Sequence, residues 1–468
     1  MRLAAFRKRN TAPSVRNVSR YLNANPLANK SKKKEVKLEK LTDQRNYREL
    51  FTFGEDYGTS EFKFGPSSLG DVPDAIESRG YFPDVTEATY GVYGFQAPRP
   101  IIVGPEVSEH LESRSDLTQR LIHPMTSGLI ESSDDKAWTV VKEITRYGLK
   151  RYAPSSSSGF EGFNCVAALF SGSPRYMYEK VFAIHEEINR EENQRLVKNV
   201  TVIPQPLAVA IAQKAVTCTV IEAGHGNTQI TPISKAVINS SLLTLNRGGS
   251  DVDALAGEIL RDAGYGDLAK ERKFVKLFKE TVGLVPQDLK KVMENDHEEK
   301  FRFLFKIPGT RISVDLGGAA WQRFLLGEFF FNPENEVFQS YYKRGFRRPT
   351  DSYLKGDVVP GTVNLVDAIT KSIERCSFEI QGNLYHNILL SGGNFAWRVP
   401  PGLEEYSTDC ATKITSMLEA SGVSGAKVIT TNNPQYNVWQ GLIVYGLYLP
   451  ENCEWKWERQ EGWITVTQ

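Results

Sequence analysis

The chain has 468 residues, of which 40% are apolar and 24% charged, so it is long enough for more than one compact unit with a substantial core. No apolar run approaches the roughly 18 residues of a membrane span. Five scattered cysteines form no Cys-x-x-Cys pair and lie at no ligand spacing from the six histidines. This pattern argues against a disulfide framework and against zinc, and it indicates a reducing compartment.

The basic residues are concentrated at the N-terminus. Residues 1–48 carry 14 Lys or Arg and 3 Asp or Glu, a net charge of +11, whereas the remainder carries −10. We expect a disordered N-terminal extension that is either a solvated arm or a contact for a regulatory protein or another acidic partner. Nucleic acid and a membrane surface are weaker alternatives. The start is too short and too charged for a secretory signal, although its Arg-rich composition faintly resembles a transit peptide.

The first half of the chain alternates strands and helices. We predict a first strand at Leu50–Phe53 and short β-like runs from about 64 to 100, closed by a strand at 101–104. The segment Ser133-Asp134-Asp135 is expected to cap a helix with Trp138, Val141 and Ile144 on one face. Further strands are predicted at 165–170 and 200–203, with helices at 176–189 and 207–212.

The second half repeats this order. We predict a strand at 218–222, a helix at 251–262 capped by Ser250, a long amphipathic helix over 365–380 and a strand at 387–390. Strands alternating with helices are typical of an α/β sandwich. The hairpin that opens each half indicates a duplicated β-β-β-α-β-α-β unit.

Two hairpins share a pattern suited to phosphate. In one, Asp56 ends a strand before the turn Gly58-Thr59-Ser60; in the other, Glu222 precedes the turn Gly224-His225-Gly226-Asn227. A carboxylate at the end of a buried strand requires a cation. Small-residue turns let backbone N–H groups reach phosphate oxygens. Two facing hairpins would hold a polyphosphate, with carboxylates ready for Mg²⁺, and this indicates a two-domain ATPase.

At this point the residues match a known family. The chain resembles actins from about Phe51 to Gln468, and among them it is most similar to the archaeal homologue crenactin. The segments that carry the resemblance are, in order, 56–63, 203–211, 222–228, 389–394 and 436–441. A single Gly-rich turn is weak evidence, whereas five segments in the correct order over much of the chain are specific.

The resemblance implies the actin, Hsp70 and sugar-kinase fold, which is ribonuclease H-like, with two α/β domains around a nucleotide cleft. It places the first domain at 49–212 plus 437–468, with a small lobe at about 75–108. The second domain would be 213–436, with a small lobe at about 250–320.

The resemblance also implies site residues. Gln205 would orient the attacking water, with Glu222 and His225 also catalytic. Asp56 and Glu222 would hold Mg²⁺ through waters. The residues expected to bind ATP are Gly58, Thr59, Ser60, Lys63, Gly224, Gly226, Asn227, Gly249, Lys276, Gly392, Gly393, Asn394 and Gln435.

Three positions depart from the actin pattern. Glu222 replaces an aspartate, which keeps the carboxylate but changes its reach. His225 takes the place of a second aspartate, where a neutral ring could bond water or phosphate and a charged ring would repel Mg²⁺. Gln229 falls where actins carry a histidine near the water.

The function implied is that of a cytoplasmic, cytoskeletal ATPase that polymerises into filaments. The aromatic and basic run Tyr341–Arg348 and the segment Phe330–Pro333 are candidates for contacts between subunits. Two alternatives stay open: a non-polymerising actin-related scaffold, and a small-molecule kinase of the same superfamily. A kinase would need an acidic base where Gln205 stands.

Overall fold

The computed structural model describes residues 45–83, 101–155, 159–297, 299–307, 309–354 and 356–467. Residues 1–44 of the predicted extension, residues 84–100 of the β-like region and the loop residues 156–158 lie outside this part. Within it, the helices are either too short or too polar to cross a bilayer.

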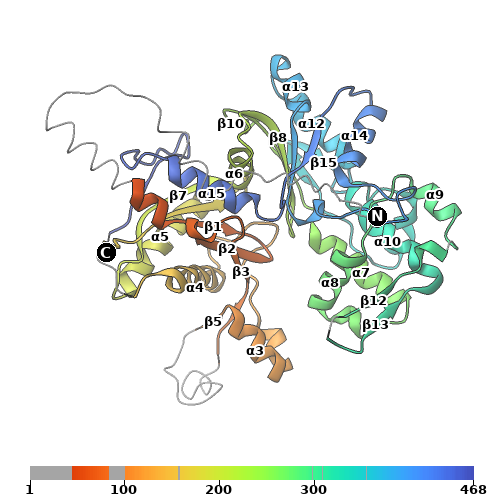
Figure 1. Cartoon of the computed structure of the whole chain (residues 1–468), viewed down its shortest axis with the longest axis horizontal. Helices are drawn as coiled ribbons and strands as arrows, with labels where there is room; N and C mark the ends of the chain where they lie inside the picture. Colours follow the sequence, from red (N-terminus) through yellow and green to blue (C-terminus); the bar gives the residue numbers. More distant parts are fainter. Residues whose placement is uncertain are drawn as a thin grey trace, which may run out of the picture.

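The first half is built on one mixed sheet (Figure 1). In spatial order its strands are β18 (Ile464–Thr465), β7 (Val197–Pro204), β6 (Phe163–Leu169), β1 (Thr52–Tyr57), β2 (Glu61–Pro66) and β3 (Asp74–Glu77). β1 runs parallel to β6 and antiparallel to β2. The predicted order, a hairpin followed by strands joined through helices, is therefore confirmed in this half.

Helices cover both faces of the first sheet. The helices α4 (Asp135–Tyr152) and α5 (Arg175–Glu191) pack with Phe53, Cys165 and Ala167 in one cluster. The next residues on β6, Val166 and Ala168, face the opposite side, where α6 (Gln205–Ala212) and α15 (Asn437–Tyr448) lie. The alternation follows from the two-residue period of a strand. Each side of β1 and β6 therefore meets a different environment.

The second half has a sheet of the same design. Its order is β10 (Ala236–Val237), β9 (Thr228–Ser234), β8 (Thr217–Ala223), β16 (Ile388–Ser391) and β17 (Val428–Thr430), with β11 (Leu243–Leu245) also on β9. The largest core cluster lies on one face, under α7 (Gly249–Asp262) and α12 (Leu365–Glu374). The other face shares its core with the first half through α6 and α15.

The helices α6 and α15 form the layer between the sheets. They contact closely because Gly441 carries no side chain, and a Cβ there would lie 1.8 Å from the carbonyl oxygen of Ala208. Although α15 is near the C-terminus, it packs on β1 and β6 of the first half. The chain thus crosses between the halves at two places, once through α6 and once before α15.

The remaining elements form the outer parts. The strands are β4 (Gly80–Tyr81), β5 (Ile102–Val103), β12 (Leu304–Lys306), β13 (Ser313–Asp315), β14 (Ser352–Leu354) and β15 (Asp357–Val359). The α-helices are α3 (Pro105–Ser113), α8 (Arg272–Val282), α9 (Leu289–Glu294), α10 (Arg323–Phe331), α11 (Gln339–Lys343), α13 (Phe378–Tyr385) and α14 (Cys410–Ala420). Short 3₁₀ turns occupy Ser67–Leu69, Ser115–Arg120, Leu268–Lys270, Glu299–Phe301, Gly317–Gln322, Glu336–Phe338 and Gly393–Phe395.

The start of the ordered chain differs from the prediction. Residues 45–51 are helical, so the first strand begins at Thr52 rather than at Leu50. This helix is tied to the body, because the Tyr47 hydroxyl donates to the Gly162 carbonyl at 2.6 Å and Arg48 to the Leu449 carbonyl at 2.7 Å. Residues 45–48 are therefore not part of a disordered extension.

Two helix predictions were wrong in detail. Ser250 lies inside α7, and the Asp251 carboxylate caps that helix by accepting the Gly248 N–H at 2.9 Å. The expected long helix over 365–380 is two helices, α12 and α13, separated at 375–377. Asn364 caps α12, whereas Ser377 occupies the N-cap position of α13. The apolar pattern continues across the break, which is why periodicity alone does not reveal it.

Candidate functional site

A cavity of about 410 Å³ lies where the two sheets meet. Its walls include the ends of β1 and β8, the helix α8 and the segments after β16 and β17. Every residue that the sequence predicted for ATP, metal or catalysis lines this cavity: Asp56, Gly58, Thr59, Ser60, Lys63, Gln205, Glu222, Gly224, His225, Gly226, Asn227, Gly249, Lys276, Gly392, Gly393, Asn394 and Gln435. The structure therefore brings together residues from both halves of the chain.

The tips of the two hairpins meet in this cavity. Gly226 comes so close to the first turn that a Cβ there would lie 2.8 Å from the Thr59 hydroxyl oxygen. Within the described residues, the backbone N–H groups of Thr59, Ser60, His225 and Gly226 have no protein acceptor. Free backbone donors at facing turns are the arrangement that phosphate oxygens require.

A chain of side-chain amides joins the two halves beneath the turns. Gln205 donates through Nε2 to Asp56 Oδ1 at 2.9 Å, and its Oε1 accepts from Gln229 Nε2 at 2.9 Å. The same Gln229 nitrogen donates to Glu222 Oε2 at 2.9 Å, and Gln229 Oε1 accepts the Ser171 N–H at 2.8 Å. These bonds fix which way each amide faces. The predicted carboxylates are thus linked through Gln205 and Gln229.

The two carboxylates that this hydrogen-bonded chain connects, Asp56 and Glu222, are buried with little positive charge nearby. Burial, and then the nearby Asp56, raise the pKa of Glu222 to about 8. Burial also raises the pKa of Asp56, although Lys63 and the Gln205 hydrogen bond act in the opposite direction. The Lys63 nitrogen is 3.9 Å from Asp56 Oδ2. Two oxygen-donor groups that lack a full counter-charge fit a hard divalent cation such as Mg²⁺.

His225 is neutral at physiological pH. Burial, together with Lys279 and Lys276, lowers its pKa to about 4, although Asp253 acts in the opposite direction. Its Nδ1 lies 3.7 Å from Asp253 Oδ2. Of the two alternatives that the sequence left open, the structure favours the neutral ring over the charged one.

Lys276 makes an ion pair across the cavity. Its nitrogen is 2.6 Å from Glu61 Oε1, so α8 of the second half contacts β2 of the first half. Both side chains are 34% exposed. Lys276 was expected to bind ATP, but in this structure its charged group pairs with Glu61.

The turn after β16 forms another wall. Gly392 has a φ of 98°, and a Cβ there would lie 2.2 Å from the Ala223 carbonyl oxygen, so only glycine fits. The Asn394 amide donates to the Gly224 carbonyl at 2.7 Å. Asn394 therefore supports the second hairpin turn, and Gly249 approaches the Asn394 side chain from α7.

Several residues of this site were not predicted from the sequence as site residues. Gln229 was noted only as a departure from the actin pattern, although it links Gln205 to Glu222 beneath the cavity. Lys279 lines the cavity and pairs with Asp253 at 2.7 Å. Its position three residues after Lys276 places both on one helix face, which is a signal that could have identified it. Glu280, Trp397 and Tyr436 also line the cavity.

Comparison with known proteins decides the family. The family model described as Actin matches residues 192–442, which is more than half of the chain. The chain belongs to the actin family. Its two mixed sheets are those of the actin and Hsp70 fold, as the sequence predicted. The first hairpin turn lies outside the matched range, so its assignment depends on the geometry described above.

Individual relatives of this actin-family chain are distant. It is 28% identical over 267 residues to actin-related protein 3 of Neurospora crassa, covering 54% of each chain. It is 28% identical to the protein of that name from Schizosaccharomyces pombe, covering 49% of this chain and 51% of the relative. The Dictyostelium discoideum protein is 27% identical, covering 49% and 53%. The chain thus spans about half the length of the curated relatives it matches.

Proposed function

We propose that this actin-family protein binds ATP with Mg²⁺ in the cavity between its halves and hydrolyses it. The observation that carries the proposal is the hydrogen-bonded chain from Asp56 through Gln205 and Gln229 to Glu222, lying under two turns with free backbone donors. Phosphate donors, metal-binding oxygens and a water-orienting amide thus occur in one place.

Each group has a distinct role in binding. The backbone N–H groups of the Gly58–Ser60 and Gly224–Asn227 turns would hold the phosphate oxygens, with Lys63 adding a positive charge. Asp56 and Glu222 would hold Mg²⁺ through waters, and a bound Mg²⁺ would offset the negative charge of the phosphates. Gly249, Gly392 and Gly393 would leave room for the adenosine, with Gln435 at its edge.

Gln205 would position the water that attacks the terminal phosphate. Its amide is held at both ends, by Asp56 and by Gln229, so its direction is set before substrate binds. A neutral amide orients water without itself taking the proton. Glu222 and the neutral His225 would act alongside it. Gln229 is the positioning residue that holds Gln205 in this orientation.

We further propose the domain division predicted above, 49–212 with 437–468 against 213–436. These two domains would close on the nucleotide by a hinge motion at the two segments where the chain crosses between them, 205–212 and 435–441. In support, the helices at the two crossings, α6 and α15, lie so close together that no side chain would fit at Gly441.

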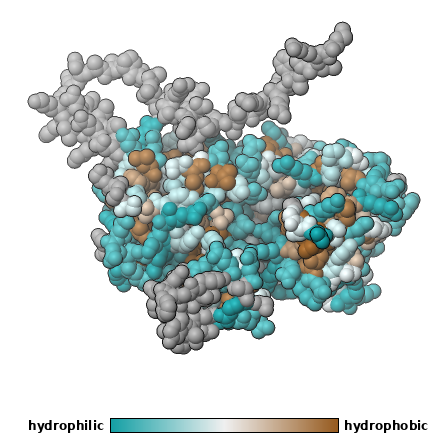
Figure 2. Space-filling model, turned by 60° about the horizontal axis from the view of Figure 1, so that its bottom comes forward, coloured by the Kyte–Doolittle hydropathy of each residue, from teal (hydrophilic) through white to brown (hydrophobic). Residues whose placement is uncertain are grey.

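We propose assembly into filaments as the consequence of nucleotide binding, in the cytoplasm. The hairpin of β14 and β15 supports it, because Tyr353 and Val358 are paired across the strands and are 71% and 55% exposed. Phe330 and Phe331 are fully buried and make no such surface, contrary to our expectation of a subunit contact there. Figure 2 shows a mainly hydrophilic face with hydrophobic groups in separate patches. We also propose a regulatory protein or an acidic partner for the basic N-terminal extension, and a place for this chain on the crenactin branch of the family.

The test measures phosphate release and assembly with the purified full-length chain. We expect ATP hydrolysis that requires Mg²⁺, and particles that pellet and form filaments in negative stain only with nucleotide. Gln194→Ala, which changes an exposed glutamine outside the cavity, serves as the matched control for Gln205→Ala. Hydrolysis without filaments across salts and temperatures would favour the non-polymerising scaffold. Turnover that rises only with an added small-molecule acceptor would favour the kinase.

A further inference from the structure

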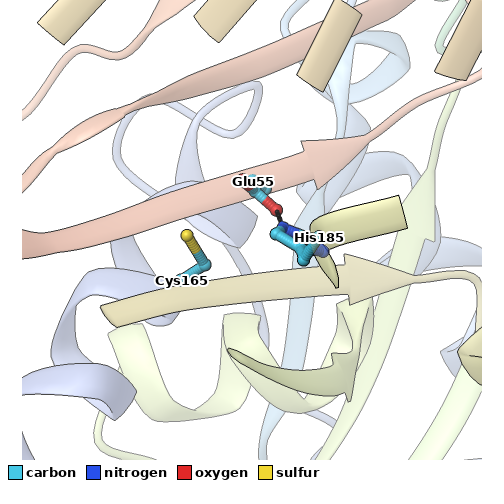
Figure 3. A group of neighbouring side chains, drawn as sticks. All are labelled: Glu55, Cys165 and His185. Carbon is cyan, nitrogen blue, oxygen red and sulfur yellow. Dashed lines mark hydrogen bonds and ion pairs between the residues drawn. The ribbon is translucent and has the colours of Figure 1, made fainter. Parts of the chain in front are cut away.

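Three metal-ligating side chains converge on the side of β1 that faces away from the cavity. They are Glu55 on β1, Cys165 on β6 and His185 on α5, and Figure 3 shows Glu55 and His185 joined by a hydrogen bond, with Cys165 on the neighbouring strand beside them. One ligand atom of each lies within 4.8 Å of the other two. All three residues are fully buried. Because successive side chains alternate along a strand, Glu55 faces this cluster while Asp56 faces the cavity.

The histidine has the orientation of a metal ligand. Its Nδ1 lies 2.7 Å from the carbonyl oxygen of Val181, so Nδ1 carries a proton and donates it there. Its Nε2 points at Glu55 Oε2, 2.9 Å away. Metal-binding histidines characteristically donate their other ring N–H to a carbonyl or carboxylate in this way, which orients the ring so that Nε2 becomes the ligand atom when it loses its proton.

The carboxylate of the cluster keeps unused bonding capacity. Glu55 Oε1 is buried and has no hydrogen-bond partner among the described residues. The other oxygen, Oε2, accepts from His185 and from the Tyr57 hydroxyl at 3.2 Å. A buried acceptor without a donor costs free energy unless something else binds it. The Cys165 thiol, on the neighbouring strand, is the remaining group of the cluster.

We propose that Glu55, Cys165 and His185 bind one zinc ion. Thiolate, imidazole and carboxylate together are the ligand set that zinc prefers, and magnesium or calcium would not select a thiol. The Tyr57 hydroxyl donates to Glu55 Oε2 at 3.2 Å and so holds this carboxylate on the side of the cluster. Cys165 lies 110 positions after Glu55, and His185 lies 20 positions after Cys165. Such wide spacing does not form a zinc motif, so the sequence alone indicated no zinc site.

Charge balance supports binding of a divalent ion. Without metal, both His185 ring nitrogens face acceptors, the Val181 carbonyl and the Glu55 carboxylate, so with a neutral Cys165 thiol the His185 and Glu55 pair has no net charge. Zinc binding would release one proton from His185 Nε2 and one from the Cys165 sulfur, so Zn²⁺ with carboxylate, neutral imidazole and thiolate is again neutral. The ion thus enters a buried place without adding charge, at the expense of two released protons.

The ion would have a structural role. It would join β1, β6 and α5 on the side of β1 opposite to Asp56. Because all three ligands are inaccessible in the folded chain, loading would occur during folding. The zinc would therefore stabilise the first half and hold β1 in place, rather than take part in hydrolysis.

The test measures the zinc content of the full-length protein without nucleotide. The protein is refolded with zinc and then washed with chelator before the measurement. We expect about one zinc per chain, which is typical of a closed structural site. Refolding with Co²⁺ should give the near-ultraviolet charge-transfer band of a cobalt–thiolate bond. Release of about two protons per ion is expected in a weakly buffered titration during refolding.

The matched pair of variants is Cys165→Ser and Cys218→Ser. Both cysteines are fully buried on central strands, but Cys218 lies in the other sheet and away from the cluster. Cys165→Ser should abolish the cobalt–thiolate band and lower zinc affinity by at least about tenfold, whereas Cys218→Ser should leave both unchanged. Substoichiometric zinc and no thiolate band in the folded wild-type protein would overturn the proposal, whatever the variants do.

Discussion

Two neighbouring carboxylates on β1 are buried in opposite ways. Asp56 faces a cavity, where it meets an amide, a distant lysine and a second carboxylate. Glu55 faces the interior, where it meets a histidine at 2.9 Å and a thiol. One strand thus contributes to both ligand binding and stability. On its cavity side the carboxylate has no full counter-charge, so a bound cation can supply it. On its interior side the charge of Glu55 is balanced by neighbouring protein groups, which stabilises the fold.

The interior side should control stability most strongly. In metal-free protein, His185→Leu removes the partner of Glu55 and should lower the free energy of unfolding by about 3–5 kcal/mol, because it leaves a buried carboxylate uncompensated. Denaturant unfolding measures this. The double variant Glu55→Leu with His185→Leu should recover most of the loss, because it removes both charges. If His185→Leu alone lowered the free energy of unfolding no more than a surface substitution does, the interior side of β1 would not control stability as proposed.

The cavity side should control turnover instead. Gln205→Ala should reduce phosphate release by about 100-fold, because the attacking water loses its orientation. The same change should lower the free energy of unfolding by only about 1 kcal/mol, since it removes hydrogen bonds beside a cavity that water can enter. Gln194→Ala should alter neither quantity. Unchanged turnover with intact ATP affinity in Gln205→Ala would remove this residue from the mechanism.

His225 should make stability depend on acidity. Its pKa in the folded protein is about 4, below the ordinary 6.5, so the unfolded chain binds more protons between these values. The free energy of unfolding should therefore rise as the pH rises from about 4 to 6.5 and be lost again on acidification. His225→Gln should remove on the order of 2 kcal/mol of this dependence, after allowance for partial exposure. Parallel thermal melts of both proteins across this range measure it.

The contact across the mouth of the cavity should have the smallest effect. The ion pair of Lys276 and Glu61 is partly exposed, so Lys276→Ala should weaken closure by at most about 1 kcal/mol and speed nucleotide release up to about fivefold. Added salt should reduce the difference between the two proteins. Lys270→Ala, which changes an exposed lysine paired only within its own turn, is the control. Equal release rates at low salt would show that the pair does not hold the cavity closed.

The local parts of this site could be predicted from the sequence. A carboxylate followed by a turn of small residues is a short-range pattern, and both hairpins appear where it occurs. Contacts that depend on distant segments could not be predicted. Gln229 gains its place only because Gln205 and Glu222 lie beside it in space. The cluster of Glu55, Cys165 and His185 combines two strands and a helix, so its parts look unrelated along the chain.

Helix boundaries show the same limit. Within the predicted capping segment Ser133–Asp135, Asp134 caps α4, because its carboxylate accepts from the Ala137 N–H only three positions along the chain. The break between α12 and α13 leaves the apolar periodicity intact and was missed. Likewise Leu50 and Phe51 have the apolar character of a strand, but they end a helix. Residue patterns therefore specify which segments are regular more reliably than where each one stops.

The most direct test of the central claim is a crystal structure with Mg²⁺ and a non-hydrolysable ATP analogue. The account predicts phosphates between the Gly58–Ser60 and Gly224–Asn227 turns, with the metal facing Asp56 and Glu222 and the Gln205 amide beside the terminal phosphate. An analogue bound elsewhere, or a cavity that stays vacant at saturating concentration, would contradict it.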